Sequence, residues 1–391
     1  MRALTAGGAC GTMATYSVSG EDSIHMDEPS RFSATDLHEF CSLVLQTCGV
    51  PADEAETTAT VLIDTDLHGV DSHGIAHLSM YVPHLKRGSY KAQRAISIVH
   101  QTPSTALVDG GGGLGHPPGV FAVRLAMDKA EAAGSSTVAV RNSHHFGAAG
   151  HYAALALERD MIGMCMTNAG PGVLPTFGIQ PLIGTNPIAL AAPTGAQDPF
   201  VLDIATSVKA YGKLEIATRE GKGIPEGWFL KADGEMGRAP KDFPFWREGT
   251  AERRGGMLPI GGAGEETSGY KGYGLSLGVE ILTAMLAGNT PSALMHIYPE
   301  CPEPAISHYF SAMRIDAFQP ADEFKARMDR LLATIKASPK LPGHDRIYIP
   351  GEKEAECFRD RTSRGIPLHY KVVEDLTRLA REHDVAAPQP L

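Results

Sequence analysis

Beyond the first 30 residues, hydrophobic positions recur every three or four residues, which is the spacing of an amphipathic helix. From Ser33 to Gly88 this pattern predicts three successive helices. The first begins with a capping-box-like pair, Ser33 and Asp36, and ends at Gly49. The predicted caps of the other two helices are Asp53 and Ser72. The chain therefore opens with an all-helical unit.

After residue 95, short apolar segments alternate with helical ones. Strands are predicted at 96–100, 106–109, 137–141, 162–167, 187–192 and 200–203. Helices are predicted around Pro117 and at 148–159, 271–286, 323–335 and 372–382. The segment 271–286 is apolar on every side, so we expect it to be buried. Alternating strands and helices between helical ends predict an α/β fold.

Composition narrows the class of protein without naming it. Of 391 residues, 43% are hydrophobic and 20% are charged, as in ordinary globular proteins. The net charge of −10 argues against nucleic-acid binding, and no apolar run reaches the roughly 18–20 residues that span a bilayer. Six cysteines without CxxC spacing favour free thiols in the cytoplasm. Residues 1–30 show no signal-peptide pattern, so we expect a mobile tail.

A glycine run, Gly110–Gly113 followed by Leu114 and Gly115, satisfies the dinucleotide fingerprint GxGxxG between a predicted strand and a predicted helix. Four consecutive glycines match such a pattern easily, however. The fingerprint also requires an acidic residue at the end of the next strand, where this chain has Arg141. We therefore favour a tight turn over a Rossmann nucleotide site.

Histidines form two groups that could hold a metal ion or move a proton. His68, His73 and His77 lie within ten residues, and on a helix the i, i+4 spacing of the last two would put both imidazoles on one face, as in zinc hydrolases. The glutamate of HExxH is missing, because Gly74 follows His73. His144 and His145 follow a predicted strand, where α/β proteins place reactive groups. A neutral imidazole there can exchange a proton at neutral pH.

Six motifs in this order resemble the malate/L-lactate dehydrogenase family of the non-Rossmann type. They are Asp71–Gly74, Asn142–Gly147, Gly184–Pro187, Asp203–Ser207 with Gly212-Lys213, Gly269–Gly274 and Pro350–Glu352. Together they span nearly the whole chain from residue 31. The family also includes sulfolactate and ureidoglycolate dehydrogenases and ketimine reductases. The segment 214–228 looks most like the malate-assigned branch.

The resemblance implies a fold and an assembly. A central mixed-sheet cofactor domain, here residues 91–319, packs against a helical substructure formed by residues 31–90 and 320–391. Members are usually homodimers. The implied activity is hydride transfer between NAD, or NADP, and a small 2-hydroxy acid, with malate favoured and lactate or sulfolactate as alternatives.

The resemblance also assigns roles to single residues. His145 matches the family's proposed proton acceptor, and His73 matches a histidine that other members use as the acid or base. We predict that His145 exchanges the proton and that His73 orients the substrate with Ser72. The other expected substrate-side residues are His77, where relatives often have arginine, Tyr81 and Arg141.

A larger set is expected to contact the dinucleotide. Asp203 can accept from ribose hydroxyls, and Lys271 can meet a pyrophosphate oxygen. The remaining members are Thr167, Asn168, Thr185, Asn186, Ile204, Ala205, Thr206, Ser207, Gly272, Gly351, Glu352 and Lys353. No metal site is expected. Two other classes stay open from the sequence: a metal hydrolase using His68, His73 and His77, and a binding protein that has lost turnover.

Overall fold

The computed structural model describes residues 30–243, 253–295 and 306–391. In this part of the chain, seven strands form one mixed sheet in the order β2-β3-β4-β10-β5-β6-β7. Their bounds are Ser97–Gln101, Thr105–Asp109, Ser135–Ser143, Ile306–Arg314, Met161–Thr167, Ile188–Ala192 and Phe200–Ile204. The pair β3–β4 is parallel, and the other neighbours are antiparallel. All six predicted strands are present, and the predicted α/β class is confirmed.

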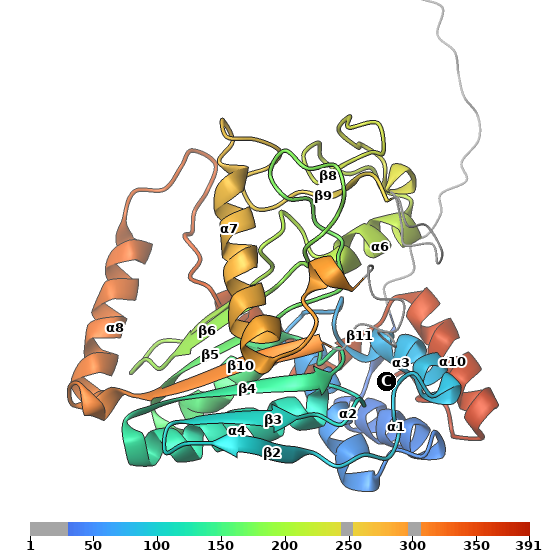
Figure 1. Cartoon of the computed structure of the whole chain (residues 1–391), viewed down its shortest axis with the longest axis horizontal. Coiled ribbons are helices and arrows are strands. Elements are labelled where there is room, and N and C mark those ends of the chain that lie inside the picture. The colour runs from blue at the N-terminus through green and yellow to red at the C-terminus, as the bar shows by residue number, and fades with distance from the viewer. Residues whose placement is uncertain (1–29, 244–252, 296–305) are drawn as a thin grey trace, which may run out of the picture.

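The central strand β10 was not predicted. It lies between β4 and β5, although more than 130 residues separate it from either in sequence. Its side chains are buried at most positions, because helices cover both faces of the sheet here. Helices α4 (His116–Ala133) and α5 (Ala149–Leu155) lie against one face, and α7 (Gly269–Glu280) crosses the other (Figure 1).

The predicted all-helical opening is confirmed as α1 (Ala34–Thr47), α2 (Ala52–Leu67) and α3 (Leu78–Arg87). They share one hydrophobic core with the C-terminal helix α10 (Tyr370–His383). The Ser33 cap is confirmed, since its hydroxyl accepts from the Asp36 N–H at 3.4 Å.

The predicted caps at Asp53 and Ser72 are wrong. The N-cap of helix α2 is Pro51, two residues before Asp53, and the fixed φ of proline suits a helix start. The third helix is preceded by the 3₁₀ turn Ile75–His77, which follows Gly74. A buried carboxylate, that of Asp66, accepts the Ile75 N–H at 2.7 Å and replaces the expected serine cap.

The predicted burial of segment 271–286 is also wrong for the single chain. Helix α7 and the π-helical turn Ile281–Met285 expose one apolar face. Ile281 is 60% exposed and Met285 is 59% exposed. The opposite side packs on the sheet, with Ser276, Val279 and Thr283 buried.

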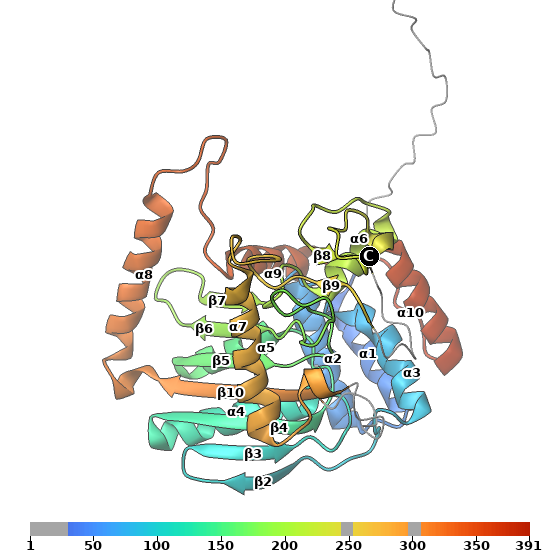
Figure 2. The same ribbon diagram turned by 45° about the horizontal axis from the view of Figure 1, so that its top comes forward.

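Helix α8 (Ala321–Ala337) lies apart from the N-terminal helices, beyond the other end of the sheet (Figure 1, Figure 2). No residue of α8 belongs to the core shared by α1, α2, α3 and α10. The division into a helical part and a cofactor domain stays a prediction, and the predicted tail, residues 1–30, lies outside the described residues except for Ser30.

Several smaller elements were not predicted. They are β1 (Arg31–Phe32), paired with β11 (Ile366–Pro367), β8 (Phe229–Leu230), paired with β9 (Gly256–Met257), and the helices α6 (Tyr211–Glu220) and α9 (Glu352–Arg364). Among the helices in the described ranges, none is both long enough and apolar enough to cross a membrane.

Candidate active site

The glycine run 110–115 is packed against other protein segments and serves as a tight turn. The Gly112 N–H donates to the Asn142 carbonyl at 2.7 Å, and the Arg94 guanidinium donates to the Gly110 carbonyl at 3.0 Å. A Cβ on Gly115 would lie 2.8 Å from the His145 carbonyl oxygen, and closer still to that of His144. The glycines thus let this turn approach the loop that holds His145, which agrees with the predicted turn.

Three imidazoles meet at the carboxyl end of β4. The ring of His77 lies 4.9 Å from that of His145 and 5.6 Å from that of His73, centroid to centroid. The rings of His73 and His145 are 5.6 Å apart, and all three pairs are nearly parallel. Each of the three residues is partly exposed. The structure therefore joins both predicted histidine groups into one accessible cluster.

Two buried side chains lie behind His145. The hydroxyl of Tyr81 is 2.6 Å from Nδ1 of His145 and 3.5 Å from Nε2 of His116. Tyr81 and His116 are both 0% exposed. Tyr81 was predicted to lie on the substrate side, but a fully buried ring has no surface for a substrate. It contacts His145 instead, and His116 was missed because nothing in its sequence neighbourhood points to the site.

The buried side chain of Asp66 packs against the segment that carries His73 and His77 and hydrogen-bonds to it. Besides accepting the Ile75 N–H, the Asp66 carboxylate lies so close to Gly74 that a side chain there would overlap it. Burial raises the pKa of Asp66 to about 8, with the Ile75 hydrogen bond opposing this and Asp71 adding to it. The Ser72 hydroxyl lies 2.9 Å from Nδ1 of His73, which agrees with the predicted pairing of these two residues.

The site keeps His73 and His145 neutral. Burial, with the charge of Lys213 as a second cause, lowers the pKa of His73 to about 4. Burial and then the neighbouring imidazoles of His77 and His73 hold the pKa of His145 well below its ordinary value. A neutral imidazole is the form that can accept a proton from an alcohol.

The cation of Arg141 is already paired. Its Nε donates to Asp109 at 3.2 Å, because the parallel register places Asp109 directly beside Arg141. Arg141 is therefore a poor substrate anchor. Lys213, in the first turn of α6, is exposed, and its side chain makes no hydrogen bond or ion pair with the described residues. Lys213 lies near the site, because the preceding residue, Gly212, packs so closely on Ser72 that a Cβ there would lie 2.9 Å from the Ser72 Cβ.

His308 on β10 connects the histidine cluster to the predicted cofactor residues. Its Nδ1 is 2.8 Å from the Thr167 hydroxyl, and its Nε2 is 2.8 Å from the Ser143 hydroxyl. Its ring stacks on Phe146 at 4.3 Å. The ends of β4 and β5 are thereby tied together, and the missed strand β10 is what positions them.

The predicted cofactor residues at the end of β5, before β6, after β7 and at the start of α7 form one continuous region. The Ala169 N–H donates to the Asn186 side chain, which in turn donates to Glu280 of α7. The Thr206 N–H donates to Thr185, and the Ile260 N–H donates to Thr206. Ile260 packs directly on Gly272, beside Lys271.

Most polar side chains in this region are used by the protein itself. The hydroxyls of Thr167, Thr206 and Ser207 donate to backbone carbonyls, and both polar ends of Asn186 are bonded. Asn168 differs, because its buried Nδ2 has no hydrogen-bond partner in the part of the chain that the structure describes, while its Oδ1 accepts from the Ser307 N–H. An unpaired buried amide is costly, so it fits a ligand acceptor at this point.

Asp203 is the penultimate residue of β7, is open to solvent, and is followed by Ile204 and Ala205. The surrounding protein raises its pKa to about 6 by desolvation, opposed by the Gly150 N–H and aided by Glu354. One oxygen accepts that Gly150 N–H at 2.7 Å, and the residue keeps contact with solvent. A carboxylate so placed can accept hydrogen bonds from a diol.

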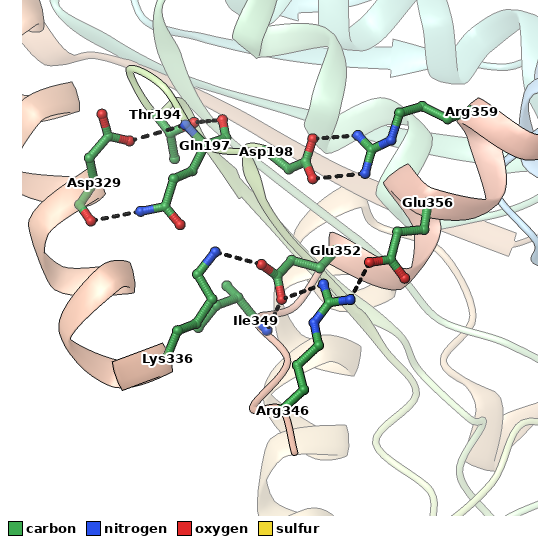
Figure 3. Close-up of polar contacts among 10 residues, drawn as sticks. All are labelled: Thr194, Gln197, Asp198, Asp329, Lys336, Arg346, Ile349, Glu352, Glu356 and Arg359. Carbon is green, nitrogen blue, oxygen red and sulfur yellow. Dashed lines mark hydrogen bonds and ion pairs between the residues drawn. The ribbon is translucent and has the colours of Figure 1, made fainter. Parts of the chain in front are cut away.

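The turn at Pro350–Gly351 lies against the edge of β7, where the Val201 N–H donates to Pro350. Glu352 is not the turn residue that was predicted but the first residue of α9. Its carboxylate accepts from Lys336 at 2.7 Å and from the Ile349 N–H at 2.9 Å, and it pairs with Arg346 (Figure 3). Glu352 is thereby engaged, whereas the amine of Lys353 lies over the Tyr348 ring.

The metal-hydrolase hypothesis gains no support from the geometry. His68 stacks on Phe358 and lies 3.3 Å from Asp64. Across residues 30–243, 253–295 and 306–391, no three His, Cys, Asp or Glu side chains are grouped so that they could hold a metal ion.

Comparison with known proteins identifies the family. The sequence matches the model of malate/L-lactate dehydrogenase over residues 32–377. The chain belongs to this family. A malate dehydrogenase of Pyrococcus abyssi is 43% identical over 351 residues, which cover 90% of this chain and 94% of that protein. An L-sulfolactate dehydrogenase of Methanocaldococcus jannaschii is 38% identical, over 87% of this chain and 93% of that protein.

Solved structures agree with the sequence relationship. A malate dehydrogenase from Entamoeba histolytica is 33% identical and superposes with a TM-score of 0.88, covering 93% of this chain and 100% of that one. A malate dehydrogenase from Pyrococcus horikoshii is 38% identical with a TM-score of 0.81. The predicted family, the non-Rossmann fold and the dehydrogenase class are confirmed, and the family implies a nicotinamide cofactor.

Proposed function

We propose that this protein is an NAD-dependent malate dehydrogenase. The observation that most supports this is the accessible stack of His73, His77 and His145, with Lys213 beside it. The identity of 43% to a malate dehydrogenase favours malate over lactate or sulfolactate. A cytoplasmic location, and NAD rather than NADP, stay predictions.

The residues divide the chemistry between them. When bound, the nicotinamide ring supplies the acceptor for the hydride that leaves C2 of the substrate. His145 removes the hydroxyl proton at Nε2, since Nδ1 faces Tyr81. His73, held by Ser72, orients the substrate. His77 and Lys213 bind its carboxylates, and an unpaired lysine suits a substrate with a second carboxylate.

The dinucleotide would be held by fewer side chains than the sequence suggests. Asn168 offers its unpaired Nδ2, Asp203 an accepting oxygen and Lys271 a cation at the start of α7. The other members of the predicted set, Thr167, Thr185, Asn186, Thr206 and Ser207, would shape the site mainly through backbone groups. Gly351 and Lys353 would border it along β7.

The exposed face of α7 supports the predicted homodimer. The face continues along the π-helical turn after α7, and its apolar residues, each more than one-third exposed, are Tyr270, Leu275, Leu277, Ile281, Met285 and Leu286. An apolar patch of this extent on a soluble chain is typical of a protein interface. Light scattering of the purified protein is expected to give twice the mass of one chain. The variant Ile281→Asp is expected to have the mass of a single chain. A monomeric wild type would contradict the proposal.

An assay at the nicotinamide absorbance band tests the activity. Malate, lactate and sulfolactate are each supplied with NAD and with NADP. We expect the highest kcat/KM for malate with NAD, because Lys213 and His77 can each bind one of its two carboxylates. A higher kcat/KM for sulfolactate or for lactate would show that this acid, and not malate, is the preferred substrate. Absence of turnover with all six pairs would favour the binding-protein alternative.

A further inference from the structure

We propose that Tyr81 is a positioning residue for proton transfer: its buried hydroxyl accepts the Nδ1–H of His145 and so keeps Nε2 free to take the substrate proton. The proposal deepens the malate dehydrogenase function and depends on it. The contact that supports it is 2.6 Å long, the shortest polar contact of the His145 ring within the described residues.

The placement of Tyr81 leaves one nitrogen of His145 for chemistry. Tyr81 is 0% exposed and lies on α3, on the interior side of the imidazole. Nδ1 therefore faces the protein, and a substrate can reach His145 only through Nε2. In the reaction, the O–H pair of electrons becomes the second C–O bond as hydride leaves C2, and the proton goes to Nε2.

A neutral imidazole has one hydrogen, and its place decides whether Nε2 can accept a proton. Two groups compete for Nδ1. The Gly147 N–H, at 3.4 Å, would pair with a bare Nδ1 and leave the hydrogen on Nε2, which is the unproductive tautomer. The Tyr81 oxygen can accept from Nδ1–H and stabilise the productive one.

His116 lets Tyr81 act as an acceptor. A tyrosine hydroxyl that accepts still needs a partner for its own hydrogen, and Nε2 of His116 lies 3.5 Å away. Burial and nearby positive groups keep the pKa of His116 well below its ordinary value, so the ring is neutral and has a lone pair. The chain of hydrogen bonds then runs from His145 to Tyr81 to His116. It ends in the interior at Nδ1 of His116, which has no hydrogen-bond partner among the described residues. The chain of hydrogen bonds therefore fixes a tautomer and conducts no protons to solvent.

Tyr81→Phe removes the hydroxyl and keeps the ring, so packing is preserved. We expect kcat for malate oxidation to fall about 10- to 100-fold, because Nδ1–H would be a buried donor without a partner. KM for malate and the affinity for NAD should not change. The acid limb of the pH profile should move to lower pH, because imidazolium loses an acceptor. The titratable neighbours of His145 are His73, His77, His116 and His308, which the substitution leaves in place.

Tyr309→Phe is the matched control, since it removes a tyrosine hydroxyl whose one hydrogen-bond partner among the described residues is Thr137, at 3.3 Å. Its kcat should equal that of the wild type. An unchanged kcat for Tyr81→Phe, or a loss that appears only in KM, would overturn the proposal.

The tautomer can be measured without turnover. Imidazole ¹⁵N shifts of histidine-labelled protein, assigned with His145→Ala, should show hydrogen on Nδ1 of His145 in the wild type and on Nε2 in Tyr81→Phe. Hydrogen on Nε2 in the wild type would overturn the proposal even if the enzyme is active. If no 2-hydroxy acid is oxidised, the proposed function fails, and the ¹⁵N spectrum still decides the role of Tyr81.

Discussion

Replacing His145 with alanine is expected to lower kcat for malate oxidation by about 10²- to 10⁴-fold, the range over which a positioned general base acts. Affinity for NAD should be preserved, because His145 lies in the imidazole stack rather than in the region around Asn168 and Asp203. Steady-state kinetics and a fluorescence titration with NADH measure the two quantities separately.

The pH profile adds a second check on His145. Its pKa is well below the ordinary value, so the neutral, accepting form prevails at all higher pH values. For oxidation, kcat/KM should stay level as the pH falls past 6.5, and should decrease only when it reaches the lowered pKa. An acid limb centred at 6.5 or above would mean that another group takes the proton.

His73→Ala is the comparison that separates the two candidate bases. We expect it mainly to raise KM, because the Ser72–His73 pair orients the substrate in this account. If His73→Ala loses kcat by orders of magnitude while His145→Ala does not, the roles are reversed.

Gly115→Ala is expected to cost about 1–3 kcal/mol in the free energy of unfolding, the usual range for overpacking. The new Cβ would lie 2.8 Å from the His145 carbonyl and 2.8 Å from the Phe146 Cβ. Relief requires the loop 144–146 to move, and a shift of about 1 Å at a catalytic group can cost about 10²-fold in rate. The midpoint temperature of thermal unfolding and kcat should therefore both decrease.

Gly223→Ala is the matched control. Gly223 is exposed and has no positive φ, and no heavy atom of residues 30–243, 253–295 or 306–391 lies within 4 Å of the added Cβ. Its free energy of unfolding should change by less than about 0.5 kcal/mol. Equal stability and equal kcat for the two variants would show that close packing at Gly115 does not position His145.

Local patterns in the sequence predicted the local structure well. The Ser33 cap and the strands on either side of His145 follow from residues that are neighbours in the chain. Strand β10 pairs with segments more than 130 residues away, so its central place is set by packing and has no local signal. His308, which connects the two parts of the site, was missed for the same reason.

The roles of individual charged residues were harder to predict. Arg141 looked like a substrate anchor because the sequence does not show that the parallel strand places Asp109 beside it. Glu352 looked like a cofactor ligand, whereas Lys336 at the end of α8 and Arg346 in the loop between α8 and α9 occupy its carboxylate. Tyr81 was chosen for the site, but its burial behind His145 depends on contacts 64 residues apart.

The fate of the C2 hydrogen tests the central claim most directly. Malate bearing deuterium at C2 is oxidised with unlabelled NAD, and the mass of the reduced dinucleotide is measured by mass spectrometry. Direct hydride transfer beside the imidazole stack predicts one deuterium in each reduced nicotinamide. Reduced dinucleotide without deuterium, or malate that is consumed with no reduced dinucleotide formed, would contradict it.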